Sequence, residues 1–165
     1  MPLIGIIANK KDVKAIKNSI QKNNIEIIEI TKESIENIKN IKFDEIIVMK
    51  KIHLTEEQNK KLNEIISKVE YLIINSDINI EPKEPVKCPI KVITFGFNSK
   101  ATITISSVKE NKIIIYIQRK IEKINKEIIE EEEKEIKVEL KSNDKIYTNL
   151  VSFIVKELHN IKNNP

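Results

Sequence analysis

Short apolar runs that alternate with segments of helical spacing are the feature of this sequence that most constrains its fold. Five runs of strand length, rich in Ile and Val, occupy residues 3–8, 25–30, 45–49, 71–75 and 91–95. Their nearly continuous apolarity indicates strands that are covered on both faces. Repeated strand and helix units predict right-handed crossovers and a mostly parallel, doubly wound sheet.

The segments between these runs have the periodicity of amphipathic helices. The apolar residues expected to share a face in each helix are Val13, Ile16 and Ile20, then Ile35 and Ile38, then Leu62, Ile65, Ile66 and Val69. Thr55 and Gln58 have the spacing of a capping box, which predicts that the third helix starts just after His53. We therefore expect a Rossmann-like α/β fold of three layers.

The pattern changes after Pro82, Pro85 and Pro89, which exclude a helix or a central strand. The segments 102–108, 112–119 and 135–140 then predict a small antiparallel subsheet. A closing helix is expected to bury Tyr147, Leu150, Val151, Ile154, Leu158 and Ile161, with Asn143 or Asp144 as its cap. We expect one domain over 1–165, with a parallel part at 1–97, the subsheet at 98–140 and the helix at 141–165.

Composition excludes several classes of function. The net charge of +4 comes from 29 basic and 25 acidic residues that are interspersed, and aromatic residues make up 4% of the chain. We therefore expect no nucleic-acid partner. No stretch has the length of a membrane span or the arrangement of a secretory signal, so no membrane association is expected. The lone Cys88 favours a reducing compartment, and we expect a cytoplasmic protein.

Two segments resemble the central ATP-binding domain of the Mur ligases, the peptidoglycan amide ligases. VITFGFNSKATITISSV at 92–108 is similar to the family's strand that ends in a Thr-Phe-Gly-Phe type turn and leads into a small β-subsheet. YLIINSDIN at 71–79 resembles the family's strand that ends in an Asn-x-Asp-Asp turn, with Ile78 in place of the second Asp.

Two more segments follow the family's order. FDEIIVMKKIHLTEEQNKKLNEII at 43–66 resembles the segment with an Asp-His turn before a helix, so that His53 would correspond to the family's His. LKSNDKIYTNLVSFIVKELHNI at 140–161 is similar to the stretch in which a helix carries an adenine-contacting Asn. The Gly and His of that turn are missing, and either Thr148 or Asn149 would take the place of the Asn.

The phosphate-binding loop departs from the family. A family member would have a GTNGKT type loop, whose backbone N–H groups and Lys hold the phosphates while Ser or Thr holds Mg²⁺. This chain has GIIANKKDVKAI at 5–16, in which Gly5 lies inside the expected strand and neither Lys10 nor Lys11 precedes Ser or Thr. We also expect no counterpart of the family's N-terminal and C-terminal domains. The resemblance therefore implies a shortened, bacterial-type pseudoenzyme without a cofactor, unless the altered loop still binds ATP and Mg²⁺.

Two classes of function follow from this reading. The first is a non-catalytic interaction or regulatory module with a protein partner, no catalytic residues and no metal site. The alternative is a small-molecule or nucleotide-binding protein, or a degenerate ATP-dependent amide ligase, related to cell-wall biosynthesis. It would use the strand-end edge near Asn9, His53, Asn75 and Gly96. The oligomeric state is left open by both.

The candidate cofactor-binding residues lie where open α/β sheets bind ligands, at the carboxyl ends of strands. They are Asn9, Lys10, Lys11, Asn75, Asp77 and Asn149. Two lysines at a helix N-terminus suit an anion, but Asp12 would repel it. The simpler alternatives are a solvated loop around the lysines and a local turn made by Asn75 and Asp77.

The remaining reactive residue types have simpler interpretations. His53 is expected to be a surface residue, because no second metal ligand lies beside it, and His159 is expected on the polar side of the last helix. The glutamate run at 130–133 is expected to be a solvated hairpin end rather than a cation site. Cys88 has no neighbouring base and is expected to be an unreactive thiol.

Overall fold

Strands and helices alternate through the first half of the computed structural model, which describes residues 1–20, 24–78, 89–138 and 145–161. The first half contains β1 (Leu3–Ile7), α1 (Lys10–Ile20), β2 (Glu26–Glu29), α2 (Ile35–Ile38), β3 (Glu45–Val48), α3 (Glu56–Ile66), β4 (Tyr71–Asn75) and β5 (Lys91–Gly96). The second half contains β6 (Ile103–Lys109), β7 (Lys112–Ile117), β8 (Ile121–Glu122), β9 (Ile128–Ile129), β10 (Glu132–Lys137) and α4 (Ile146–Leu158). The expected α/β fold class is confirmed.

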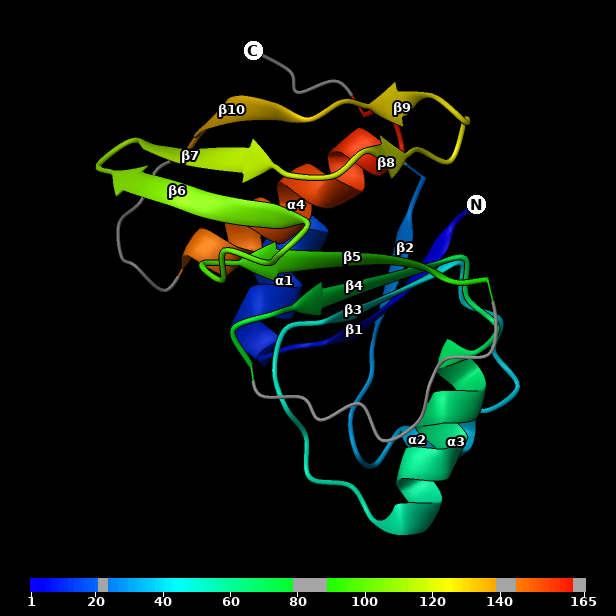
Figure 1. The fold of residues 1–165 in the computed structure, drawn as a ribbon. Coiled ribbons are helices and arrows are strands. Elements are labelled where there is room, and N and C mark those ends of the chain that lie inside the picture. The colour runs from blue at the N-terminus through cyan, green and yellow to red at the C-terminus, as the bar shows by residue number, and fades with distance from the viewer. Residues whose placement is uncertain (21–23, 79–88, 139–144, 162–165) are drawn as a thin grey trace.

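Eight strands form one sheet in the order β10-β7-β6-β5-β4-β3-β1-β2 (Figure 1). The strands from β2 to β5 are all parallel, which gives the fold its Rossmann-like part. The expected antiparallel strands are present, and β6, β7 and β10 extend the main sheet rather than standing apart from it. The junction is short, because β6 pairs with β5 only through Phe95 with Ile103 and Gly96 with Thr104. Among the described residues, β8 and β9 alone form a separate pair.

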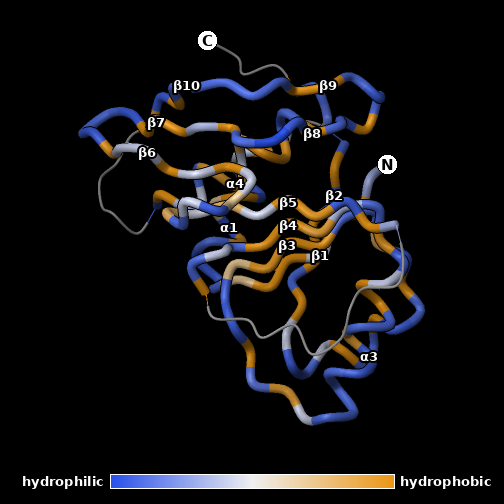
Figure 2. The backbone as a smooth tube through the Cα atoms, in the orientation of Figure 1, coloured by the Kyte–Doolittle hydropathy of each residue, from blue (hydrophilic) through white to orange (hydrophobic). Residues whose placement is uncertain are grey.

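The parallel strands are apolar along most of their length (Figure 2), and buried apolar side chains lie on both of their faces, as their sequence predicts. On one face, α1 and α4 pack in a cluster that includes Ile6, Ile47 and Ile73. On the other face, α2 and α3 pack in a second cluster that includes Ile7 and Ile46. The helices bury the expected residues Val13, Ile16, Ile20, Ile35, Ile38, Leu62 and Ile65. The core therefore lies in two layers, one on each side of the sheet.

One of the two predicted helix N-caps is confirmed. Thr55 caps α3 and forms the expected capping box with Gln58. Lys145 stands at the N-cap position of α4 without a side-chain hydrogen bond, and the expected caps Asn143 and Asp144 lie outside the described residues. Ile161 follows the end of α4 and packs against the apolar cluster that contains Ile6 and Ile47.

The last strand begins three residues earlier than the sequence predicts. We expected a strand at 135–140, whereas β10 spans Glu132–Lys137, so that the acidic run at 130–133 lies partly within it. Pairing with β7 sets this register, with Glu132 opposite Ile117. Charged side chains are tolerated there because β10 is an edge strand that faces solvent.

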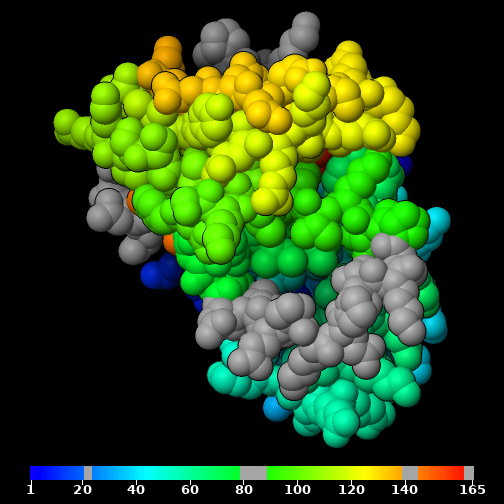
Figure 3. Space-filling view, viewed as in Figure 1, coloured from blue at the N-terminus to red at the C-terminus, as the bar shows by residue number. Residues whose placement is uncertain are grey.

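The space-filling view separates the two parts of the molecule. Green and yellow segments from β6 to β10 gather on one side, and α3, in cyan, lies toward the opposite end (Figure 3). Within the described residues, no helix combines the length and the apolarity needed to cross a membrane. Pro82 and Pro85, which were expected to exclude a helix or a central strand, and Cys88, which was expected to be an unreactive thiol, lie outside the described residues.

Candidate functional site

The carboxyl ends of β1 and β3 form the topological switch point of the sheet, where neighbouring strands continue into helices on opposite faces. Open α/β sheets bind ligands at such a point. Asn9 follows β1 and Lys50 follows β3, and Lys50 Nζ donates a hydrogen bond to Asn9 Oδ1 at 3.3 Å. Lys10 and Lys11 open α1 with exposed side chains. The predicted ligand-binding residues Asn9, Lys10 and Lys11 thus lie at the switch point together with Lys50. The sequence analysis did not predict Lys50 as a site residue.

Asp12 lies in the first turn of α1, where an anion would bind. Its Oδ1 accepts a hydrogen bond at 2.9 Å from the hydroxyl of the buried Thr148 on α4. Asn149 instead donates from Nδ2 to the carbonyl of Lys145, also at 2.9 Å. Of the two alternatives left by the sequence, Thr148 therefore contacts α1 and Asn149 bonds within its own helical turn. The Asp12 carboxylate suits the helix dipole and repels a phosphate.

Asn75 and Asp77 form a turn after β4. Asn75 Oδ1 accepts a hydrogen bond from the Asp77 N–H at 3.0 Å, as in an Asx turn. The Asp77 carboxylate accepts from the N–H of Phe97 at 2.7 Å, the N–H of Asn98 at 2.9 Å and the hydroxyl of Tyr147 at 2.7 Å. These bonds tie the loops after β4 and β5 to α4 and leave little acceptor capacity for a ligand.

Tyr147 completes this edge through aromatic contacts. Its ring centroid lies 6.2 Å from that of Phe95 and 6.1 Å from that of Phe97, which it meets edge to face. Burial, then the hydrogen bond to Asp77 and its negative charge, raises the pKa of Tyr147 to about 12. The hydroxyl is therefore protonated at neutral pH and acts as a donor to Asp77, not as a base.

Gly96 allows Asp77 to approach β5 closely. Its φ of +148° is a conformation that L side chains rarely adopt, and a Cβ at this position would lie 2.4 Å from Asp77 Oδ2. The carboxylate occupies the space that a side chain would fill. The glycine of the Thr-Phe-Gly-Phe segment at 94–97 is thus accounted for by packing and hydrogen bonding inside the protein.

At the amino ends of the strands, the buried Glu45 contacts His159, which the sequence analysis expected on the polar side of the last helix. Glu45, at the start of β3, is 0% exposed, and its Oε1 lies 2.5 Å from His159 Nε2. The side chain of His159 is 7% exposed, so its expected place on the polar side of the last helix is wrong. The residue stands at the C-cap of α4, where helical periodicity no longer sets its direction. The sequence signal for this pair is Glu45, a charged residue at the first position of an otherwise apolar strand.

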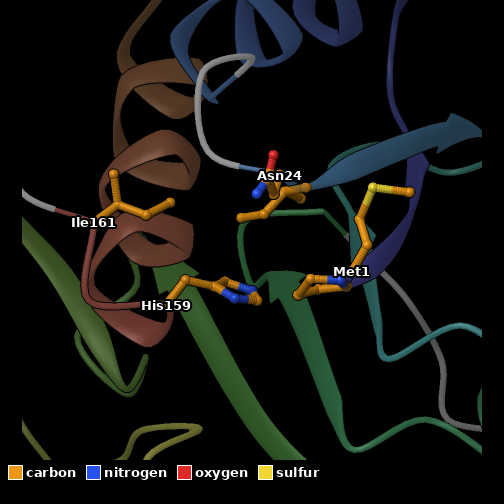
Figure 4. A pocket seen from close by; sticks show the side chains of 6 residues that line it. Met1, Asn24, His159 and Ile161 are labelled. Atoms are coloured by element: carbon orange, nitrogen blue, oxygen red, sulfur yellow. The ribbon is translucent and has the colours of Figure 1, made fainter.

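A pocket of about 540 Å³ lies beside this pair (Figure 4). Its lining residues are Met1, Pro2, Asn24, Ile25, His159 and Ile161. The close-up shows the imidazole of His159 projecting from the end of α4 toward the wall that carries Met1 and Asn24. This pocket lies at the opposite end of the strands from the predicted site.

The other candidate ligands stay apart from both places. His53 is exposed in the connection between β3 and α3. In the part of the chain that the structure describes, no three His, Cys, Asp or Glu side chains come together as a group that could hold a metal ion. The glutamates at 130–133 are exposed, as a solvated segment requires.

Comparison with known proteins adds no family. No protein-family model matches the chain, and no curated protein matches it. The contacts at the two ends of the sheet are therefore the basis for assigning a function.

Proposed function

We propose that this protein is a non-catalytic interaction module that binds a protein partner. The observation that supports this most is the engagement of the carboxylates at the carboxyl edge within the protein itself. Asp77 accepts hydrogen bonds from Phe97, Asn98 and Tyr147, and Asp12 accepts one from Thr148. In an active site, such groups are positioned for a substrate. Here they join α4 and two loops to the sheet.

Phosphate binding at the start of α1 is disfavoured on physical grounds. Glycines let a phosphate approach backbone N–H groups closely, whereas Asn9, Lys10 and Lys11 all carry side chains at this point. Asp12 adds a negative charge in the first helical turn. The strand order and the Gly96 turn are compatible with an origin from a Mur-ligase-like middle domain that has lost its nucleotide chemistry.

Calorimetric titration with Mg-ATP tests the absence of nucleotide binding. We expect no saturable heat up to millimolar nucleotide, because the side chains of Asn9, Lys10 and Lys11 hinder close approach of a phosphate to the backbone and Asp12 repels it. The Lys10→Ala/Lys11→Ala double variant should give the same flat titration as the natural sequence. Saturable binding that the double variant abolishes would overturn this proposal and favour the nucleotide-binding alternative.

The outer face of β6, β7 and β10 is the surface that we assign to the partner. One cross-strand row on it is formed by Thr104, Tyr116 and Glu133, and another by Lys109, Lys112 and Lys137. Tyr116 is 41% exposed, and exposed tyrosines are enriched at protein interfaces. The basic end fits a protein segment that presents acidic side chains to it.

Site-specific photo-cross-linking tests this surface. With the photoreactive residue p-benzoylphenylalanine in place of Tyr116, we expect one discrete adduct with a second protein in the cells that produce the chain. The matched control carries the same residue in place of His53, which is exposed in the connection between β3 and α3 and lies outside these cross-strand rows. Absence of an adduct at position 116, or the same adducts at both positions, would contradict the assignment.

A further inference from the structure

The buried carboxylate of Glu45 is only half satisfied. Its Oε1 meets His159, whereas Oε2 has no hydrogen-bond partner among the described residues. Burial of a charge with incomplete pairing costs several kcal/mol, and an apolar residue would continue β3 as Ile46 and Ile47 do. Stability therefore does not explain a glutamate at this position. Titratable groups held at such a cost are candidates for a functional site.

His159 connects this carboxylate to the pocket. An ionised carboxylate only accepts hydrogen bonds, so in the neutral ring the proton is on Nε2 and Nδ1 carries a lone pair. Within the described parts of the chain, no group bonds to Nδ1, and the ring forms part of the pocket wall. A ligand in the pocket that donates a hydrogen bond would meet this lone pair.

The rest of the wall mixes apolar and polar surface. Met1, Pro2, Ile25 and Ile161 supply hydrocarbon surface, and Asn24 adds an exposed amide. The volume of about 540 Å³ falls within the range of small-molecule sites. The pocket thus presents one hydrogen-bond acceptor that is backed by the buried carboxylate of Glu45.

We propose that this pocket binds a small apolar molecule that carries a protonated amine. The ammonium group donates to His159 Nδ1 and is attracted by the charge of Glu45, and the apolar body lies on Met1, Pro2, Ile25 and Ile161. A carboxylate ligand would face the repulsion of Glu45, and an alcohol would gain only the hydrogen bond. This binding site goes beyond the proposed function, because neither the carboxyl edge nor the face with Tyr116 takes part in it.

Three probes of similar shape test this charge preference on the full chain. Amide chemical shifts in two-dimensional NMR are followed while benzylammonium, benzyl alcohol or benzoate is added at neutral pH. We expect saturable shifts at Asn24, Ile25, His159 and Ile161 with benzylammonium, and affinity about tenfold lower with benzyl alcohol. Benzoate should cause none. Equal affinities for the three probes, or stronger binding of benzoate, would overturn the proposal.

Two variants separate the charge from the shape of the pocket. Glu45→Gln keeps the side-chain shape and removes the buried charge, so benzylammonium should bind this variant no better than benzyl alcohol does. Glu64→Gln, at an exposed position on α3, is the matched control and should bind as the natural sequence does. Unchanged selectivity in a folded Glu45→Gln variant would reject the role of Glu45. If that variant does not fold, the three-probe comparison on the natural sequence decides alone.

Discussion

Replacement of His159 by alanine is expected to lower the free energy of unfolding by about 3–5 kcal/mol, because it leaves the buried Glu45 carboxylate without its partner. Glu45 is 0% exposed, and its second oxygen already lacks a partner among the described residues. Chemical denaturation at neutral pH, followed by circular dichroism, measures the loss.

A double variant distinguishes loss of the buried hydrogen bond from loss of packing. Glu45→Leu/His159→Leu removes the buried carboxylate together with its partner and should recover most of the stability, since well-packed apolar residues often replace buried paired polar groups without cost. His53→Ala is the matched control, because His53 is exposed, and should change the free energy of unfolding little. A small loss in His159→Ala, or a double variant no more stable than the single one, would contradict the pairing.

Replacement of Gly96 by alanine is expected to destabilise the protein by about 3 kcal/mol, through backbone strain and disruption of the Asp77 hydrogen bonds. The new Cβ would lie 2.4 Å from Asp77 Oδ2 at a φ of +148°. The carboxylate would have to move away from Phe97, Asn98 and Tyr147. Thermal and chemical denaturation measure the effect, and ultraviolet titration should show a lower pKa for Tyr147.

Gly5 is the matched control for this substitution. A Cβ at Gly5 would lie 2.6 Å from Ile30 Cδ1, which is the end of a flexible side chain, at a backbone conformation open to any residue. Gly5→Ala should therefore cost about 1 kcal/mol, as mild overpacking does. If the two alanine variants lose equal stability, or if the Tyr147 pKa is unchanged in Gly96→Ala, Asp77 is not held as described.

The parallel half of the fold could be predicted because its signals are local. Ile6, Ile47 and Ile73 belong to strands covered on both faces, which are apolar almost throughout. The capping box at Thr55 likewise needs only residues three apart. The attachment of β6 to β5 could not be predicted in this way. It depends on two residue pairs at the end of β5, and strand neighbours are set by packing rather than by composition.

The candidate site shows the same division between local and long-range signals. The sequence located Asn75 and Asp77 at a strand end, but the donors to Asp77 come from residues 20, 21 and 70 positions away. Helical periodicity placed His159 on a polar face, and it failed because α4 ends at Leu158. The partner of His159 lies 114 residues earlier. Such pairs are fixed only when the whole sheet has formed.

The position of α4 also has a consequence for synthesis of the protein on the ribosome. Thr148 bonds Asp12 across 136 positions, and α4 packs beside α1 on the face that carries Ile47 and Ile73. Until α4 emerges from the exit tunnel, the nascent chain leaves part of that apolar face open to water. Exposed surface of this kind is what chaperones recognise. The order of translation thus makes the late helix the one that closes the core.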